Sequence, residues 1–211
     1  MLRSLLFSPN FIYRPEIDQN LNSTTAQPLN AYELASRLSY FLWASTPDEQ
    51  LLSAAANGSL LNDATIRSQV ARMLEDPNVL KLFHFGRFDI AAMYNAFGAL
   101  TAPVYCTKIA SRLIRTYTDR HGLKNLLQEV LNVDVSKQQQ SSDWGAERLT
   151  KAQIEYAASD VLHLHQLRTA LDLRLQREGR METAQACFDF LPTRAKLDLA
   201  GWPDTDIFAH S

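Results

Sequence analysis

Residues 79–89 read VLKLFHFGRFD and decide the fold of the second part of the chain. The first seven residues are almost all apolar, which is typical of a short buried strand. A helix is expected to begin near Asp89, so this carboxylate stands at a strand-to-helix junction from which it can reach a cleft. A single aspartate before a helix is more often an N-cap, and the functional interpretation therefore depends on the rest of the chain.

A second acidic motif, YAASD, occupies residues 156–160. It lies within a helix predicted over residues 151–177, which begins at a capping box formed by Thr150 and Gln153. Because Tyr156 and Asp160 are four residues apart, a helix places both on one face. The remaining elements expected in this part are a strand over 103–107, helices near 108–117 and 121–131, and a loop over 134–146.

The first part of the chain, residues 1–78, predicts helices only. Asn30 with Glu33, and Thr46 followed by Pro47, resemble helix starts, and a further helix is expected over 64–74. Gly58 is a plausible stop for the helix that begins at Pro47. A buried stripe at helical spacing is predicted from Leu34, Leu38, Phe41 and Leu42.

Two strings in this first part match a known helical domain. They are FIYRPE at residues 11–16 and YELASRLSYFLW at residues 32–43, and the match covers roughly residues 7–78. The segment thus resembles a domain of uncharacterised function that occurs in large secreted bacterial proteins with cytochrome-c-like modules. This resemblance implies no catalytic residues, and its apolar stripe is best interpreted as core.

The second part resembles ribonuclease D, a two-metal 3′–5′ exonuclease. The matching strings stand in family order, among them K-x-x-H-x-x-x-x-D at 81–89, ASRL at 110–113 and Q-x-x-YA-x-x-D at 153–160. The resemblance implies a ribonuclease H-like α/β fold, Mg²⁺ or Mn²⁺ as cofactor, and RNA 3′ ends as partner. It also implies that Asp89 and Asp160 are metal ligands and that Tyr156, the third catalytic residue, orients the attacking water.

The first motif of that family, an Asp-x-Glu pair on an N-terminal strand, is absent from residues 1–83. The pair Glu75-Asp76 has the wrong spacing and precedes the strand. We therefore expect an incomplete, helix-rich exonuclease domain over 79–211 that lacks its first strands, preceded by an all-α segment over 1–78. Since two-metal hydrolysis needs several converging carboxylates, we also expect hydrolysis to be weak or absent.

Basic residues over 108–124 form a candidate strip for RNA phosphates. Lys108, Arg112 and Arg115 recur at helical spacing, and Arg120 and Lys124 lie nearby, although a solvated helix face is an equally weighted interpretation. In the long loop, Lys137, Gln140 and Trp144 are candidate contacts for the RNA 3′ end, with the indole as a stacking surface.

The composition is that of an ordinary soluble globular protein of 211 residues, 46% hydrophobic and 21% charged, with a net charge of −2. Residues 1–78 hold 5 basic and 8 acidic side chains, and residues 79–211 hold 16 and 15. The two cysteines form no zinc or redox spacing and favour a reducing, cytoplasmic location. No apolar run is long enough to span a bilayer, and neither a small-molecule cofactor nor a membrane is expected as partner.

Three functions stay open at this point. The first is a metal-dependent 3′–5′ exoribonuclease that trims RNA ends. The second is a non-catalytic nucleic-acid-binding remnant that uses the basic strip. The third is a helical interaction protein in which the second part is a poorly folded passenger.

Overall fold

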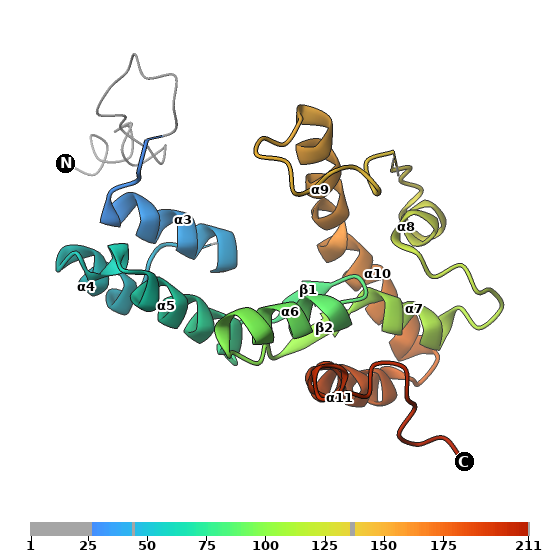
Figure 1. Cartoon of the computed structure of the whole chain (residues 1–211). Helices are drawn as coiled ribbons and strands as arrows, with labels where there is room; N and C mark the ends of the chain where they lie inside the picture. Colours follow the sequence, from blue (N-terminus) through green and yellow to red (C-terminus); the bar gives the residue numbers. More distant parts are fainter. Residues whose placement is uncertain (1–26, 44, 136–137, 211) are drawn as a thin grey trace, which may run out of the picture. The chain divides into compact units, whose positions relative to one another are not determined.

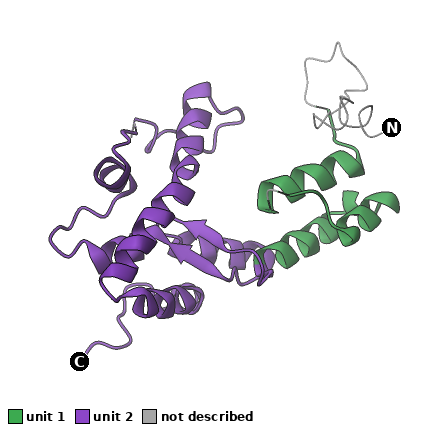
Figure 2. Ribbon diagram, turned by 180° about the vertical axis from the view of Figure 1, so that it is seen from behind, with its two compact units in different colours: residues 1–74 green, residues 75–211 purple. Residues whose placement is uncertain are grey.

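The computed structural model describes residues 27–43, 45–135 and 138–210. It divides the chain into two compact units, Met1–Leu74 and Glu75–Ser211, which are described separately below (Figures 1 and 2). The division falls four residues before the predicted boundary at residue 78. The FIYRPE string and Lys137 lie outside the described residues.

The first unit is helical, as its sequence predicts. It contains α3 (Ala31–Trp43), α4 (Glu49–Ala56), a 3₁₀ turn at Ser59–Leu61, and α5 (Asp63–Glu75), which runs to the unit boundary. A small core holds these elements together. Its buried members are Ala31, Ala35, Leu51, Ala54, Ala55, Leu60 and Met73.

The helix starts in this unit follow local capping chemistry. Asn30 and Glu33 form the predicted reciprocal pair, with the Asn30 side chain accepting from the Glu33 amide at 3.0 Å and the Glu33 carboxylate accepting from the Asn30 amide at 2.8 Å. The predicted start of α4 at Pro47 is wrong by two residues. Asp48 is the N-cap and accepts from the Leu51 amide at 2.9 Å, in keeping with the stronger capping preference of aspartate over threonine.

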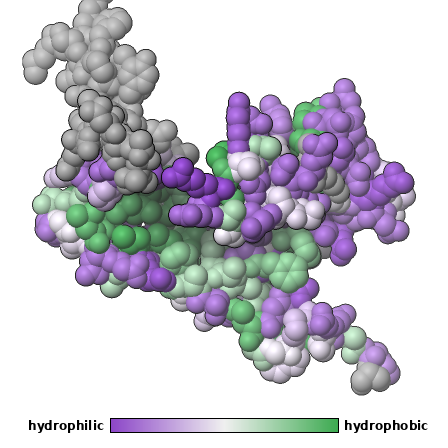
Figure 3. All heavy atoms as spheres, turned by 45° about the horizontal axis from the view of Figure 1, so that its top comes forward, coloured by the Kyte–Doolittle hydropathy of each residue, from purple (hydrophilic) through white to green (hydrophobic). Residues whose placement is uncertain are grey.

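The buried face of α3 differs from the predicted stripe. Phe41 is 84% exposed, while Leu34, Leu38 and Leu42 pack against the core as expected. Ala31 and Ala35 lie at the centre of the buried face, because their small side chains let α4 approach closely. Phe41 lies at the edge of that face and is left exposed. Figure 3 shows hydrophobic residues gathered on the visible face of this unit, at the left of the view.

The second unit is built on a small parallel sheet. Strand β1 (Lys81–Phe83) pairs with β2 (Val104–Cys106), with Lys81 opposite Val104 and Phe83 opposite Cys106. The helices are α6 (Arg87–Phe97), α7 (Thr107–Ile114), α8 (Leu123–Leu131), α9 (Lys151–Leu162), α10 (Leu164–Arg177) and α11 (Met181–Leu199). This arrangement confirms the predicted helix-rich α/β fold with few strands. The helix predicted over 151–177 is divided at His163 into α9 and α10.

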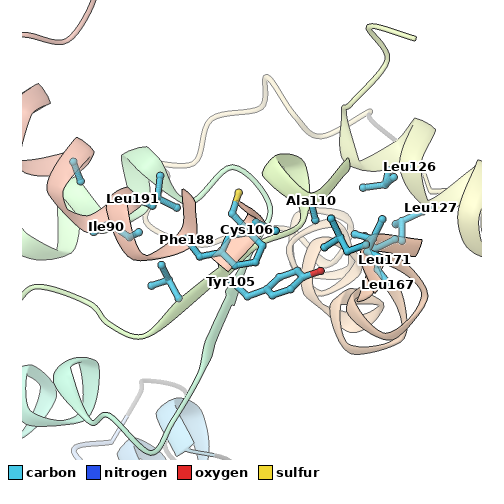
Figure 4. Packing of buried hydrophobic residues seen from close by; sticks show 14 of the residues in the cluster. Ile90, Tyr105, Cys106, Ala110, Leu126, Leu127, Leu167, Leu171, Phe188 and Leu191 are labelled. Carbon is cyan, nitrogen blue, oxygen red and sulfur yellow. The ribbon is translucent and has the colours of Figure 1, made fainter. Parts of the chain in front are cut away.

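Strand β2 lies at the centre of the core of this unit (Figure 4). Tyr105 packs its ring 4.5 Å from that of Phe188 on α11, and Leu167 and Leu171 of α10 are fully buried. Helix α10 packs on α7 and α8, and α11 packs on α6 and β2. The core therefore fixes the ends of both strands.

Among the helices that the structure describes, none combines the length and the apolar character that crossing a bilayer requires.

Candidate active site

A cavity of about 400 Å³ opens beside the end of β1. Segments that are far apart in the sequence contribute to its wall: the β1–α6 turn, the start of α7, the start of α8, the loop before α9, and α9 itself. Six of the residues singled out from the sequence line it: Asp89, Lys108, Lys124, Gln140, Tyr156 and Asp160.

Asp89 enters the cavity from the first turn of α6. The turn before it is tight, because a Cβ atom at Gly86 would lie 2.6 Å from the Cβ of Phe83. The N-terminal end of a helix favours negative charge. Partial removal from solvent acts in the opposite direction and raises the pKa of the Asp89 carboxyl above its ordinary value.

Tyr156 and Asp160 enter from α9 on one helix face, as their spacing predicts. Burial raises the pKa of the Asp160 carboxyl, and the nearby Tyr156 hydroxyl offsets part of the effect. Burial, together with the neighbouring carboxylate, also raises the pKa of Tyr156, so the phenol keeps its proton at neutral pH.

The described donors do not by themselves make up a two-metal site. Asp89 and Asp160 line one cavity, but within residues 27–43, 45–135 and 138–210 no group of three or more metal-ligating side chains comes together. The upstream pair does not join them. Glu75 accepts a hydrogen bond from the Leu100 amide at 2.9 Å and lines a different cavity, and Asp76 accepts from the Asn78 amide.

His84 lines the cavity as a neutral side chain. Its Nδ1 lies 2.9 Å from the Thr107 hydroxyl, which in turn donates to the Phe83 carbonyl at 3.2 Å. Burial, with a contribution from Lys108, lowers the pKa of His84 to about 4.

The predicted basic strip is divided by the structure. Lys108 lines the cavity, and Arg112 follows it one turn later on α7 with an exposed side chain. Arg115 lies just past the end of α7 and is buried, with its guanidinium bound to Glu129. Lys124 lines the cavity and forms an ion pair with Asp134 at 3.0 Å. Arg115 is therefore unavailable to phosphate, because its guanidinium is buried and paired with Glu129.

The loop before α9 is tied to that helix by Gln153, whose role the sequence indicated only through the capping box. Its side-chain amide donates to the Ser142 hydroxyl at 3.2 Å and to the Asp143 carbonyl at 2.8 Å. Its carbonyl accepts from the Thr150 amide at 2.8 Å. These bonds hold Trp144 beside Tyr156, with ring centroids 5.9 Å apart. Gln140, from the same loop, lines the cavity.

Comparison with known proteins identifies the fold that carries this site. The 3′–5′ exonuclease family matches residues 45–176, more than half of the chain. Ribonuclease D of Gluconacetobacter diazotrophicus is 38% identical over 110 residues, which are 52% of this chain and 28% of that protein. The chain thus spans less than a third of the length of this curated relative.

Solved structures of NrnC from Brucella melitensis also match. The structure of NrnC bound to pGG is 60% identical, with a TM-score of 0.65, and the match covers 67% of this chain and 69% of that one. The structure of NrnC with bound Mg²⁺ is 58% identical, with a TM-score of 0.64 and the same coverage. The chain belongs to the 3′–5′ exonuclease family of the ribonuclease D type.

Proposed function

We propose that this chain binds the 3′ ends of RNA in the cavity formed by the β1–α6 turn, α7 and α9, as a ribonuclease D-type 3′–5′ exoribonuclease whose hydrolysis is weak or absent. One observation carries the proposal. Asp89, Tyr156 and Asp160, drawn from two motifs some 70 residues apart in the printed sequence, line a single cavity of about 400 Å³. No other described cavity brings these three residues together.

Two features support a nucleic-acid ligand. Lys108 gives the cavity a cation, and the loop that carries Gln140 and Trp144 borders it with polar and aromatic groups that suit an unpaired nucleotide. The related NrnC structure bound to pGG supports the same chemical class of ligand. We propose Lys108, Arg112, Gln140 and Trp144 as RNA contacts, and place the activity in the cytoplasm.

A divalent cation belongs to the proposal. Carboxylate oxygens are the ligands that Mg²⁺ and Mn²⁺ prefer, and the related NrnC structure with bound Mg²⁺ supports this choice for Asp89 and Asp160. Two carboxylates leave a cation short of anionic ligands, which is the reason we expect little hydrolysis. We also propose that the helical segment at residues 1–78 is a separate domain that takes no part in this site.

A second candidate, RNA binding without any hydrolysis, is favoured because no group of three or more metal-ligating side chains comes together among the described residues. Incubating RNA labelled at its 5′ end with the protein and Mn²⁺ decides between weak hydrolysis and binding alone. Stepwise shortening from the 3′ end that disappears in Asp160→Asn supports the enzyme. Retardation in a native gel without shortening, weakening steeply as salt is raised, supports the binding protein.

A further inference from the structure

The turn from β1 into α6 places a bulky residue in a backbone conformation that glycine favours. Phe85 has a φ of 65°, in the left-handed region. The neighbouring Gly86 does not relieve this, because it meets a different steric need: a side chain there would collide with Phe83. Phe85, and not Gly86, therefore adopts the left-handed conformation. Strained residues of this kind cluster at functional sites, where the surrounding structure holds them in place.

Core packing does not account for this strain. The Phe85 side chain is 39% exposed. Its aromatic neighbour Phe88 meets it edge to face at 5.4 Å and is itself 60% exposed. Local packing therefore buries too little apolar surface to offset the unfavourable backbone conformation of Phe85. The left-handed conformation instead places Phe85 in the wall of the cavity that Asp89 and Asp160 also line.

Lys108 lies against the aromatic ring of Phe85. Its Nζ lies 3.6 Å from the centroid of Phe85, and it lines the same cavity. Around this ammonium the described part of the chain supplies no carboxylate in an ion pair, whereas Lys124 and Arg115 are neutralised by Asp134 and Glu129. A cation held on an aromatic face, rather than by an acid, is available to a phosphate without first breaking a salt bridge.

We propose that Phe85 is a stacking surface for a base at the 3′ end of the bound RNA and that Lys108 contacts the adjoining phosphate. This inference rests on the proposed function and deepens it. It states that the protein recognises the RNA 3′ end by stacking on the flat face of a base. Every base has such a face, so binding by this surface tolerates any terminal sequence. Trp144, beside Tyr156, is then a second aromatic surface bordering the cavity.

The test compares two short RNAs, each labelled with fluorescein at its 5′ end and titrated with the full chain in Mg²⁺. One has ordinary bases throughout, and the other lacks the bases of its last two nucleotides. Wild-type protein should bind the first about tenfold more tightly than the second, by fluorescence anisotropy. Phe85→Leu should bind the two RNAs alike, and Phe85→Trp should keep the difference.

Three further variants separate stacking from structure. Phe88→Leu, three residues away and outside the cavity, should keep the tenfold difference. Phe85→Gly should lose it while the melting temperature rises by about 2–5 °C, because glycine relieves the left-handed strain. Lys108→Gln should weaken binding of both RNAs equally and reduce the salt dependence by about one phosphate contact.

The proposed function and the role of Phe85 can be disproved separately. If wild-type protein binds neither RNA, the proposed function is wrong and the stacking surface with it. If it binds both RNAs equally, or if Phe85→Leu keeps the difference, RNA binding stands and the role of Phe85 is overturned.

Discussion

At the scale of single residues, Arg115 is a charged side chain that the second unit buries almost completely. Arg115 is 1% exposed, and Glu129 on α8 binds its guanidinium. The guanidinium also donates to the Ser111 hydroxyl at 3.1 Å and to the Arg120 carbonyl at 2.8 Å. A buried cation of this kind is tolerated only while its partners are present. Arg115 thus joins α7, α8 and the connection between them.

Removing the carboxylate should expose this dependence. In Glu129→Gln the guanidinium keeps its position but loses its counter-charge. Because Glu129 itself is 39% exposed, we expect a loss of about 1–2 kcal/mol in the free energy of unfolding at pH 7. Chemical denaturation with urea measures this loss. Lys151→Gln, which breaks the exposed pair with Glu155, should change the free energy of unfolding by less than about 0.5 kcal/mol.

The same pair should give the stability a defined pH dependence. Hydrogen bonds from Arg115 and Tyr117 lower the pKa of Glu129 to about 2. A carboxyl whose pKa is lower in the folded state stabilises the fold above its unfolded pKa and loses that contribution as pH falls toward the folded value. The stability difference between wild type and Glu129→Gln should therefore shrink from about pH 4.5 down to pH 2. An unchanged difference over that range would show that the pair is not formed.

At the scale of elements, the loop before α9 depends on one side chain. Gln153 bonds Ser142, Asp143 and Thr150 at once and is 4% exposed. In Gln153→Leu these bonds are lost together, and the free energy of unfolding should fall by about 1–2 kcal/mol. Trp144 should also separate from Tyr156.

Acrylamide quenching in a background of Trp43→Phe and Trp202→Phe reports on Trp144 alone. Quenching should increase in Gln153→Leu. The matched change Gln176→Leu, on the exposed side of α10, should leave both the quenching and the stability as they were. Equal quenching in all three proteins would mean that Gln153 does not position the loop.

Much of this unit could be predicted from local sequence signals, because those signals are themselves local. The apolar run before Asp89 gives β1, and the Thr150–Gln153 box gives the start of α9. Helix α11 was not predicted, although Ala184, Phe188, Leu191 and Ala195 recur at helical spacing and are all buried. Pro192, within that helix, obscures its pattern.

The site was harder to predict where tertiary contacts decide it. The burial of Arg115 depends on Glu129, which lies on a different helix. The left-handed conformation of Phe85 occurs in the tight turn beside Gly86, where a side chain would collide with Phe83. Neither feature produces a periodic pattern in the sequence from which it could be predicted. By contrast, the sharing of one face by Tyr156 and Asp160 follows from helical geometry alone.

At the scale of the whole molecule, the two units have separate cores, and we expect them to unfold separately. Leu60 is fully buried in the first unit and Leu171 in the second. Leu60→Ala should lower the stability of residues 27–74 by about 2–5 kcal/mol and leave the second unit unaffected. Leu171→Ala should do the reverse. Hydrogen exchange followed by mass spectrometry assigns each loss to its unit, and a loss of protection shared by both units would contradict their independence.

We propose that Asp89, Tyr156 and Asp160 line a cavity for RNA 3′ ends in which RNA is hydrolysed slowly or not at all. The most direct test follows a 5′-labelled RNA incubated with Mn²⁺ and either wild-type protein or Asp160→Asn, with samples run on native and denaturing gels. We expect wild type to retard the RNA, to shorten it slowly or not at all, and to retard it markedly more than Asp160→Asn does. Rapid shortening by wild type, or equal retardation by the two proteins, would contradict the proposal.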